Sequence, residues 1–191
     1  STPGVPAATD MHFRIGGVAW QMLATVLLRT IENDPARLAL TDPVSKWYPG
    51  YPYADLATVR MLAASSAGFG DYIYAPDFVA QVDANPLRVW TTDDIIGYSV
   101  APYQHPQFTT PGQNWAYSHT DLVMLGGVLE KVTGRKYGAL VQELVFDPLG
   151  LRNTRFQLDA SPQLPVLHTL EEDHFQDSTY WNPSSMCRRL A

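Results

Sequence analysis

Apolar residues recur at helical spacing along most of this chain, and the alternation that is typical of strands is scarce. The clearest segments run from Val18 to Glu32 and from Ser118 to Thr133, each with an apolar stripe of residues three and four apart. Asn33-Asp34-Pro35 should end the first segment, because proline disfavours helical geometry in the residue before it. Gly134 suits a left-handed cap after the second. The sequence therefore predicts a mainly helical chain.

Shorter helices are predicted between turns that are rich in proline and glycine. They cover residues 58–64, 76–84, 92–100 and 137–145. Residues 101–116 contain three prolines and are predicted to form an irregular loop. Beyond residue 156 the periodicity weakens, and a short strand near 166–170 is the candidate element there.

Charge and composition exclude several classes of function. The 191 residues fit one globular domain, and 13 Lys and Arg against 19 Asp and Glu give a net charge of -6. Nucleic-acid binding needs a concentrated positive surface, and Arg188-Arg189 is the largest basic cluster, so that role is excluded. The sequence contains no run of 18 apolar residues, so no transmembrane segment is predicted. Cys187 is alone, the His168 and His174 region has no ligand spacing, and we expect neither metal nor cofactor.

Six short blocks follow one another in an order that indicates a known family. Residues 13–18 read Phe-Arg-Ile-Gly-Gly-Val, and residues 115–120 read Trp-Ala-Tyr-Ser-His-Thr after a Pro111-Gly112 turn. The other blocks are residues 42–49, 58–68, 125–134 and 148–154. Together they resemble the serine β-lactamase and penicillin-binding-protein superfamily, in the branch with class C β-lactamases, DD-peptidases and β-lactamase-type esterases.

This resemblance implies a fold and a division of the chain. The expected fold class is mainly α, namely the helical region of the superfamily's α/β fold with little of the central sheet present. We expect 1–10 to be a flexible N-terminal segment, 11–156 a β-lactamase-like helical domain, and 157–191 a weaker-matching tail of the same domain. Residues 1–10 lack the pattern of a signal peptide, and export to the periplasm or cell envelope is implied by the resemblance alone.

The resemblance also implies which residues occupy the catalytic positions. The family's nucleophile is the serine of a Ser-x-x-Lys motif, whose lysine lies one helical turn later and takes the hydroxyl proton. The matching positions hold Gly17 and Trp20. The second motif keeps Tyr117 but has His119 where asparagine is usual, and the third Lys/His-Thr/Ser-Gly motif is missing. We expect His119 and Trp115 to contact substrate, and Gly17 to lie at the start of a helix that Tyr117 approaches across a cleft.

Each of these residues also has an ordinary structural interpretation, so three functions stay open. Trp20 can fill space, Tyr117 can pack, and His119 can cap a helix. The first function is a catalytically inactive relative that binds a small acyl, carboxylate, peptide or β-lactam-like ligand. The second is an active β-lactamase, DD-carboxypeptidase or esterase whose nucleophile is altered in this sequence. The third is a fragment without activity. The sequence does not predict an oligomeric state.

Overall fold

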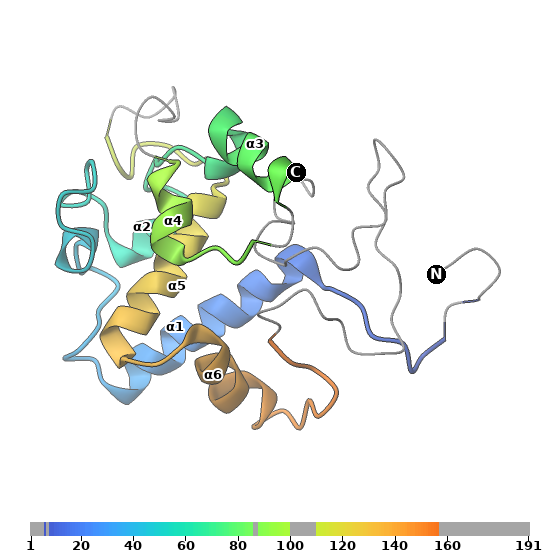
Figure 1. The fold of residues 1–191 in the computed structure, drawn as a ribbon. Helices are drawn as coiled ribbons and strands as arrows, with labels where there is room; N and C mark the ends of the chain where they lie inside the picture. The colour runs from blue at the N-terminus through green and yellow to red at the C-terminus, as the bar shows by residue number, and fades with distance from the viewer. Residues whose placement is uncertain (1–5, 7, 86–87, 100–109, 157–191) are drawn as a thin grey trace.

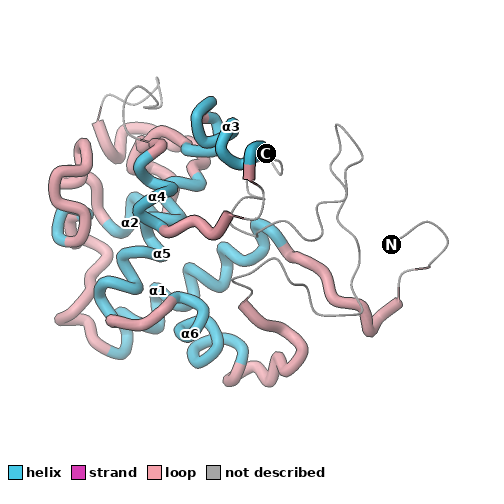
Figure 2. Tube along the Cα trace, in the orientation of Figure 1, coloured by secondary structure: helices cyan, strands magenta, loops and turns pink. Residues whose placement is uncertain are grey.

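The described residues of the protein form helices that are joined by loops (Figure 1). The computed structural model describes residues 6, 8–85, 88–99 and 110–156. Within them Figure 2 shows no strand, and an isolated β-bridge joins Pro43 and Thr58. The α-helices are α1 (Trp20–Asn33), α2 (Val59–Ala63), α3 (Pro76–Ala84), α4 (Thr92–Gly97), α5 (His119–Thr133) and α6 (Tyr137–Val141).

Helix α5 lies at the centre of the fold, with α1, α2, α4 and α6 packed around it. The Ser118 side chain accepts a hydrogen bond from the Asp121 N–H and caps the start of α5. Gly134, with φ +71°, ends the helix in the left-handed conformation. The predicted helix over 118–133 is confirmed, and α3 matches the predicted span 76–84.

The predicted 18–32 helix begins differently from the expectation. Gly16 has φ +51°, and residues Gly16–Ala19 form a 3-10 turn before α1 begins at Trp20. Two consecutive glycines have low helix propensity, which explains why the regular helix starts later. The buried face of α1 consists of Leu23, Val26 and Leu27. Leu28 is 52% exposed, so α1 is buried on one face and open to solvent on another.

Two other predicted helices differ from the structure at their C-terminal ends. Helix α4 ends at Gly97 rather than near residue 100, and Ser99 Oγ donates a 2.6 Å hydrogen bond to the Ile96 carbonyl just beyond it. The predicted 137–145 helix is α6 followed by a π-helical turn, Gln142–Phe146. A hydroxyl that competes for a helix carbonyl favours an earlier end than apolar periodicity predicts.

Two sequence predictions fall mostly beyond the described residues. The candidate strand at 166–170 lies outside them, as does most of the 101–116 loop. The described part of that loop, 110–116, is irregular as predicted. None of the described helices is long and apolar enough to cross a membrane.

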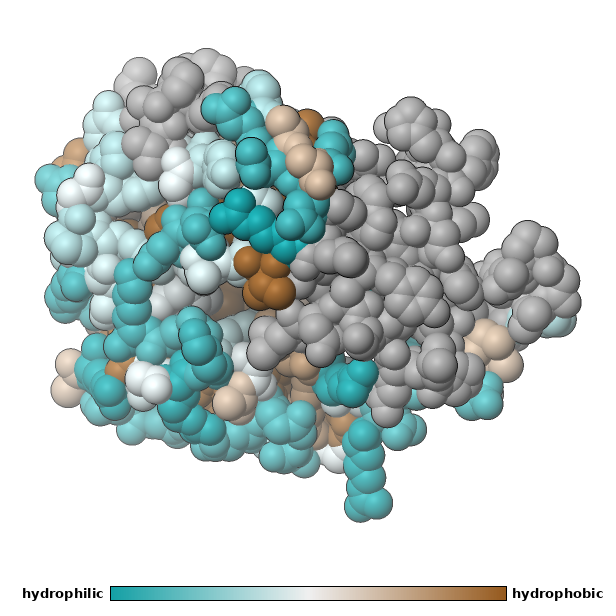
Figure 3. Space-filling model, in the orientation of Figure 1, coloured by the Kyte–Doolittle hydropathy of each residue, from teal (hydrophilic) through white to brown (hydrophobic). Residues whose placement is uncertain are grey.

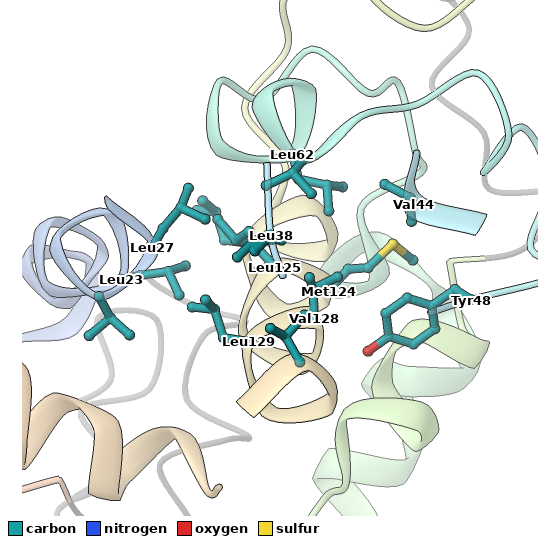
Figure 4. Packing of buried hydrophobic residues seen from close by; sticks show 14 of the residues in the cluster. Leu23, Leu27, Leu38, Val44, Tyr48, Leu62, Met124, Leu125, Val128 and Leu129 are labelled. Carbon is teal, nitrogen blue, oxygen red and sulfur yellow. The ribbon is translucent and has the colours of Figure 1, made fainter. Parts of the chain in front are cut away.

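The main core lies where α1 and α5 meet. Figure 4 shows Leu23 and Leu27 of α1 directed toward Leu125 and Leu129 of α5. A second cluster joins α3, α4 and the residues before α3, namely Tyr72, Ile73, Ala75, Phe78, Val82, Trp90 and Ile95. Val123 of α5 packs against both clusters, so the two cores together fix the position of α5.

The hydropathy of the surface shown in Figure 3 does not mark a functional site. In Figure 3 the described residues present a mostly hydrophilic face, with apolar side chains scattered over it. Isolated apolar side chains are normal on folded proteins. The candidate site therefore has to be found from its contacts.

Candidate functional site

The structure brings Gly17, Trp20 and Tyr117 together. The indole Nε1–H of Trp20 donates a hydrogen bond of 2.7 Å to the Tyr117 hydroxyl, across 97 residues of sequence. A Cβ atom added at Gly17 would lie 3.4 Å from Nε1 and 3.5 Å from Cδ1 of Trp20. The indole therefore fills the space between the start of α1 and Tyr117, so these residues meet through direct contacts.

Backbone hydrogen bonds hold the loop that carries Tyr117. The Gly112 N–H donates to the Ser66 carbonyl at 2.8 Å, and the Ala116 N–H donates to the Ser65 carbonyl at 3.0 Å. Ser65 has φ +50°, a left-handed conformation that costs a non-glycine residue about 1 kcal/mol. This turn after α2 thereby fixes the path of the chain into α5.

His119 is the first residue of α5 and is clamped by Asp71. Its backbone N–H donates to Asp71 Oδ2 at 3.1 Å, and its Nδ1 lies 2.9 Å from the same oxygen. Asp71 Oδ1 accepts from the Ile73 N–H at 3.3 Å. The two side chains are each only 7% exposed. His119 is therefore a buried and oriented side chain.

Sequence reasoning missed Asp71. The signal that could have found it is local, because an aspartate directly before the short turn Tyr72–Tyr74 is a typical N-cap. Its partner His119 lies 48 residues away, and no local pattern predicts that contact.

Aromatic rings surround the His119 imidazole. The ring of Tyr117 lies 4.8 Å from it, that of Trp20 6.3 Å and that of Tyr72 6.4 Å, all edge-on. Tyr117 is 45% exposed, so this group reaches the surface. Trp115 is 68% exposed, and among the described residues its ring makes no ring contact.

Asp121 is a second buried carboxyl near this site. Its Oδ2 accepts a 3.3 Å hydrogen bond from the Ala67 N–H, and its buried Oδ1 has no partner among the described residues. Burial, together with the negative charge of Asp71, raises the pKa of the Asp121 carboxyl well above its usual range. A neutral carboxyl at this position fits a structural role better than an ionised catalytic one.

No metal centre is visible in the part of the chain that the structure describes. Those residues contain no group of three or more His, Cys, Asp or Glu side chains placed to bind an ion. His168 and His174 lie outside the described residues.

Comparison with known proteins gives consistent matches. The family model described as Beta-lactamase matches residues 1–185. Penicillin-binding protein 4* of Bacillus subtilis is 31% identical over 78% of this chain and 32% of the relative. Esterase EstB of Burkholderia gladioli is 30% identical over 84% of this chain and 42% of the relative. This chain therefore spans less than half the length of either relative.

A solved structure supports the same comparison. The D-stereospecific amidohydrolase from a Streptomyces species superposes with a TM-score of 0.78 and 31% identity, over 93% of this chain and 55% of that protein. The described residues correspond to a helical region of these larger proteins. The prediction of a mainly α chain from such a region is confirmed.

Proposed function

This chain belongs to the β-lactamase family of serine hydrolases, and from that premise we propose that it is a catalytically inactive member whose altered site binds an acyl or carboxylate ligand. The observation that carries the proposal is the hydrogen bond between Trp20 and Tyr117 beside Gly17. The Trp20 indole thereby occupies the place where the resemblance implies a lysine.

The site lacks the family's nucleophile. Gly17 has no side chain that can attack an acyl carbon. A Cβ at Gly17 would meet Trp20 only at ordinary contact distance, so packing does not require glycine here. Loss of such a nucleophile lowers turnover by about a millionfold in serine hydrolases that have been tested this way.

The site also lacks the family's base. An indole N–H is a donor only and cannot take a proton from a hydroxyl. A serine side chain at position 17 would begin 3.4 Å from this donor rather than beside a lysine. Tyr117 keeps its hydroxyl, but Trp20 donates to its oxygen. The nucleophile and its lysine base are therefore both replaced, by Gly17 and Trp20, while Tyr117 is retained.

The site keeps groups that can bind a ligand. The Gly17 N–H meets no acceptor among the described residues, so it is available to a ligand oxygen. Val18 is 58% exposed and Trp115 is 68% exposed, and both offer apolar area. We expect affinity between about micromolar and millimolar, or roughly 4–8 kcal/mol. Peptide and β-lactam-like ligands belong to the same acyl class.

The proposal extends to the organisation and location of the chain. Residues 11–156 act as the helical domain, with 1–10 as an N-terminal segment and 157–191 as the weaker-matching C-terminal tail of the same domain. Kinship with penicillin-binding proteins supports export to the periplasm or cell envelope. The chain spans less than half the length of these relatives, so the activity of a whole relative would need residues beyond the matched region.

Turnover assays test the proposal. A chromogenic cephalosporin and a fluorogenic ester should be hydrolysed no faster than in buffer, and Tyr117→Phe should leave this background unchanged. Tyr74→Phe is the matched control, because Tyr74 is a 69% exposed tyrosine elsewhere on the surface. Hydrolysis clearly above buffer that Tyr117→Phe abolishes and Tyr74→Phe retains would establish the alternative, an active hydrolase.

A further inference from the structure

The Asp71 carboxyl collects three N–H groups from two segments of the chain. Oδ2 faces both the backbone N–H of His119, at 3.1 Å, and its ring Nδ1, at 2.9 Å. Oδ1 accepts from the Ile73 N–H at 3.3 Å. Each oxygen thus already accepts from a donor, and the Asp71 and His119 side chains are each 7% exposed.

The arrangement sets which nitrogen of a neutral His119 carries the proton when Asp71 is ionised. An ionised carboxylate only accepts hydrogen bonds, so Nδ1 must be the donor to Asp71. In a neutral imidazole the other nitrogen, Nε2, is then an acceptor. Among the described residues Asp71 forms no ion pair with lysine or arginine, so His119 is its only side-chain partner there.

The Nε2 edge of the ring points away from Asp71, because the two nitrogens lie on different sides of the imidazole. The Trp20 N–H is already donated to the Tyr117 hydroxyl. Tyr117 is 45% exposed and packs edge-on against His119 at 4.8 Å, so the ring lies close beneath the accessible part of the site.

We propose that Asp71 is a positioning residue that holds His119 with Nε2 as a hydrogen-bond acceptor, so that the site selects neutral acyl ligands that carry an N–H over carboxylates. The proposal rests on the ligand site of the proposed function and names the class of ligand. An N–H of the ligand can donate to Nε2. A carboxylate has no proton to donate, and its negative charge is repelled by that of Asp71. The negative charge of Asp71 already contributes to the raised pKa of Asp121.

The first test reads the tautomer of the resting protein. In ¹⁵N-labelled protein at neutral pH, long-range ¹H–¹⁵N spectra distinguish a protonated from an unprotonated ring nitrogen. We expect His119 to carry its proton on Nδ1. Asp71→Ala should shift it toward Nε2, whereas Asp71→Asn, which keeps one acceptor oxygen, should retain it. Asp77→Ala is the matched control, because Asp77 is exposed at the start of α3.

The second test compares two ligands of the same shape. Benzamide should bind at least about tenfold more tightly than benzoate, with the His119 Nε2 signal moving only for benzamide. Asp71→Ala should reduce this preference. A proton on Nε2 in the unmodified protein, or equal or tighter binding of benzoate, would overturn the proposal. The tautomer is read without any turnover, so discovery of hydrolase activity would defeat the proposed function and leave this result standing.

Discussion

Replacement of Gly127 by alanine should destabilise the helix that carries His119. A Cβ at Gly127 would lie 2.0 Å from the Tyr48 hydroxyl oxygen and 2.8 Å from Thr92 Cγ2, both far inside contact distance. Tyr48 is 6% exposed, and its ring is covered by Lys131 Nζ at 3.6 Å from the centroid. The tyrosine therefore cannot move aside without disturbing α5 and α4.

The magnitude follows from two opposing effects. Overpacking of a filled core costs about 1–3 kcal/mol, whereas alanine gains about 1 kcal/mol of helix propensity over glycine. Gly126→Ala is the matched control, because a Cβ there meets nothing within 4 Å and only the propensity gain applies. The difference in free energy of unfolding between the two variants isolates the clash. Because the Cβ would approach Tyr48 to 2.0 Å, we expect this difference to be about 2–3 kcal/mol.

Thermal and urea denaturation measure this difference directly. It corresponds to roughly 4–12 °C in Tm, with Gly126→Ala above the parent and Gly127→Ala below Gly126→Ala. Equal midpoints for the two variants would refute the packing of Tyr48 against α5. So would a Gly127→Ala protein that is more stable than the Gly126→Ala protein.

Three further predictions concern the site. The double variant Gly17→Ser/Trp20→Lys should be labelled by a fluorescent penicillin to a greater extent than the two single variants added together, because nucleophile and base act as one unit. Labelling of Gly17→Ser alone that equals the labelling of the double variant would contradict the interpretation of Trp20. Burial, with the charge of Asp71, raises the pKa of Asp121 in the folded state, so the folded protein holds that proton more tightly than the unfolded chain. The contribution of Asp121 to the free energy of unfolding should therefore fall as pH rises above about 4, by at most about 1.4 kcal/mol per pH unit, and urea titrations should show this contribution as the difference in slope between the parent and Asp121→Asn. Trp115→Ala should change the free energy of unfolding by less than about 0.5 kcal/mol, because the side chain is 68% exposed, while weakening benzamide binding in an NMR titration.

Local signals predicted the helices best where a cap residue marks the end. Ser118 and Gly134 bound α5 as their residue types indicate. The start of α1 was not predicted, because the conformation of Gly16 has no counterpart in apolar periodicity. The early end of α4 was missed for a related reason, since the Ser99 hydroxyl bonds the backbone in a way that periodicity does not register.

The candidate site was predictable only in part. The resemblance to a family related Gly17 and Trp20 to Tyr117, and the structure places the last two in hydrogen-bond contact. The catalytic and ligand roles of these residues remain predictions. Asp71 could not be assigned to His119 from the sequence, because their contact depends on the three-dimensional path of the loop before α3.

Intact-protein mass spectrometry tests the central claim most directly. The unmodified protein is incubated with a penicillin and with an activated ester, and its mass is compared with that of untreated protein. We predict that neither reagent forms an adduct that depends on Tyr117, because Gly17 offers no nucleophile at the site and Trp20 no base. An acyl adduct on the unmodified protein that is lost in Tyr117→Phe and retained in Tyr74→Phe would contradict catalytic inactivity.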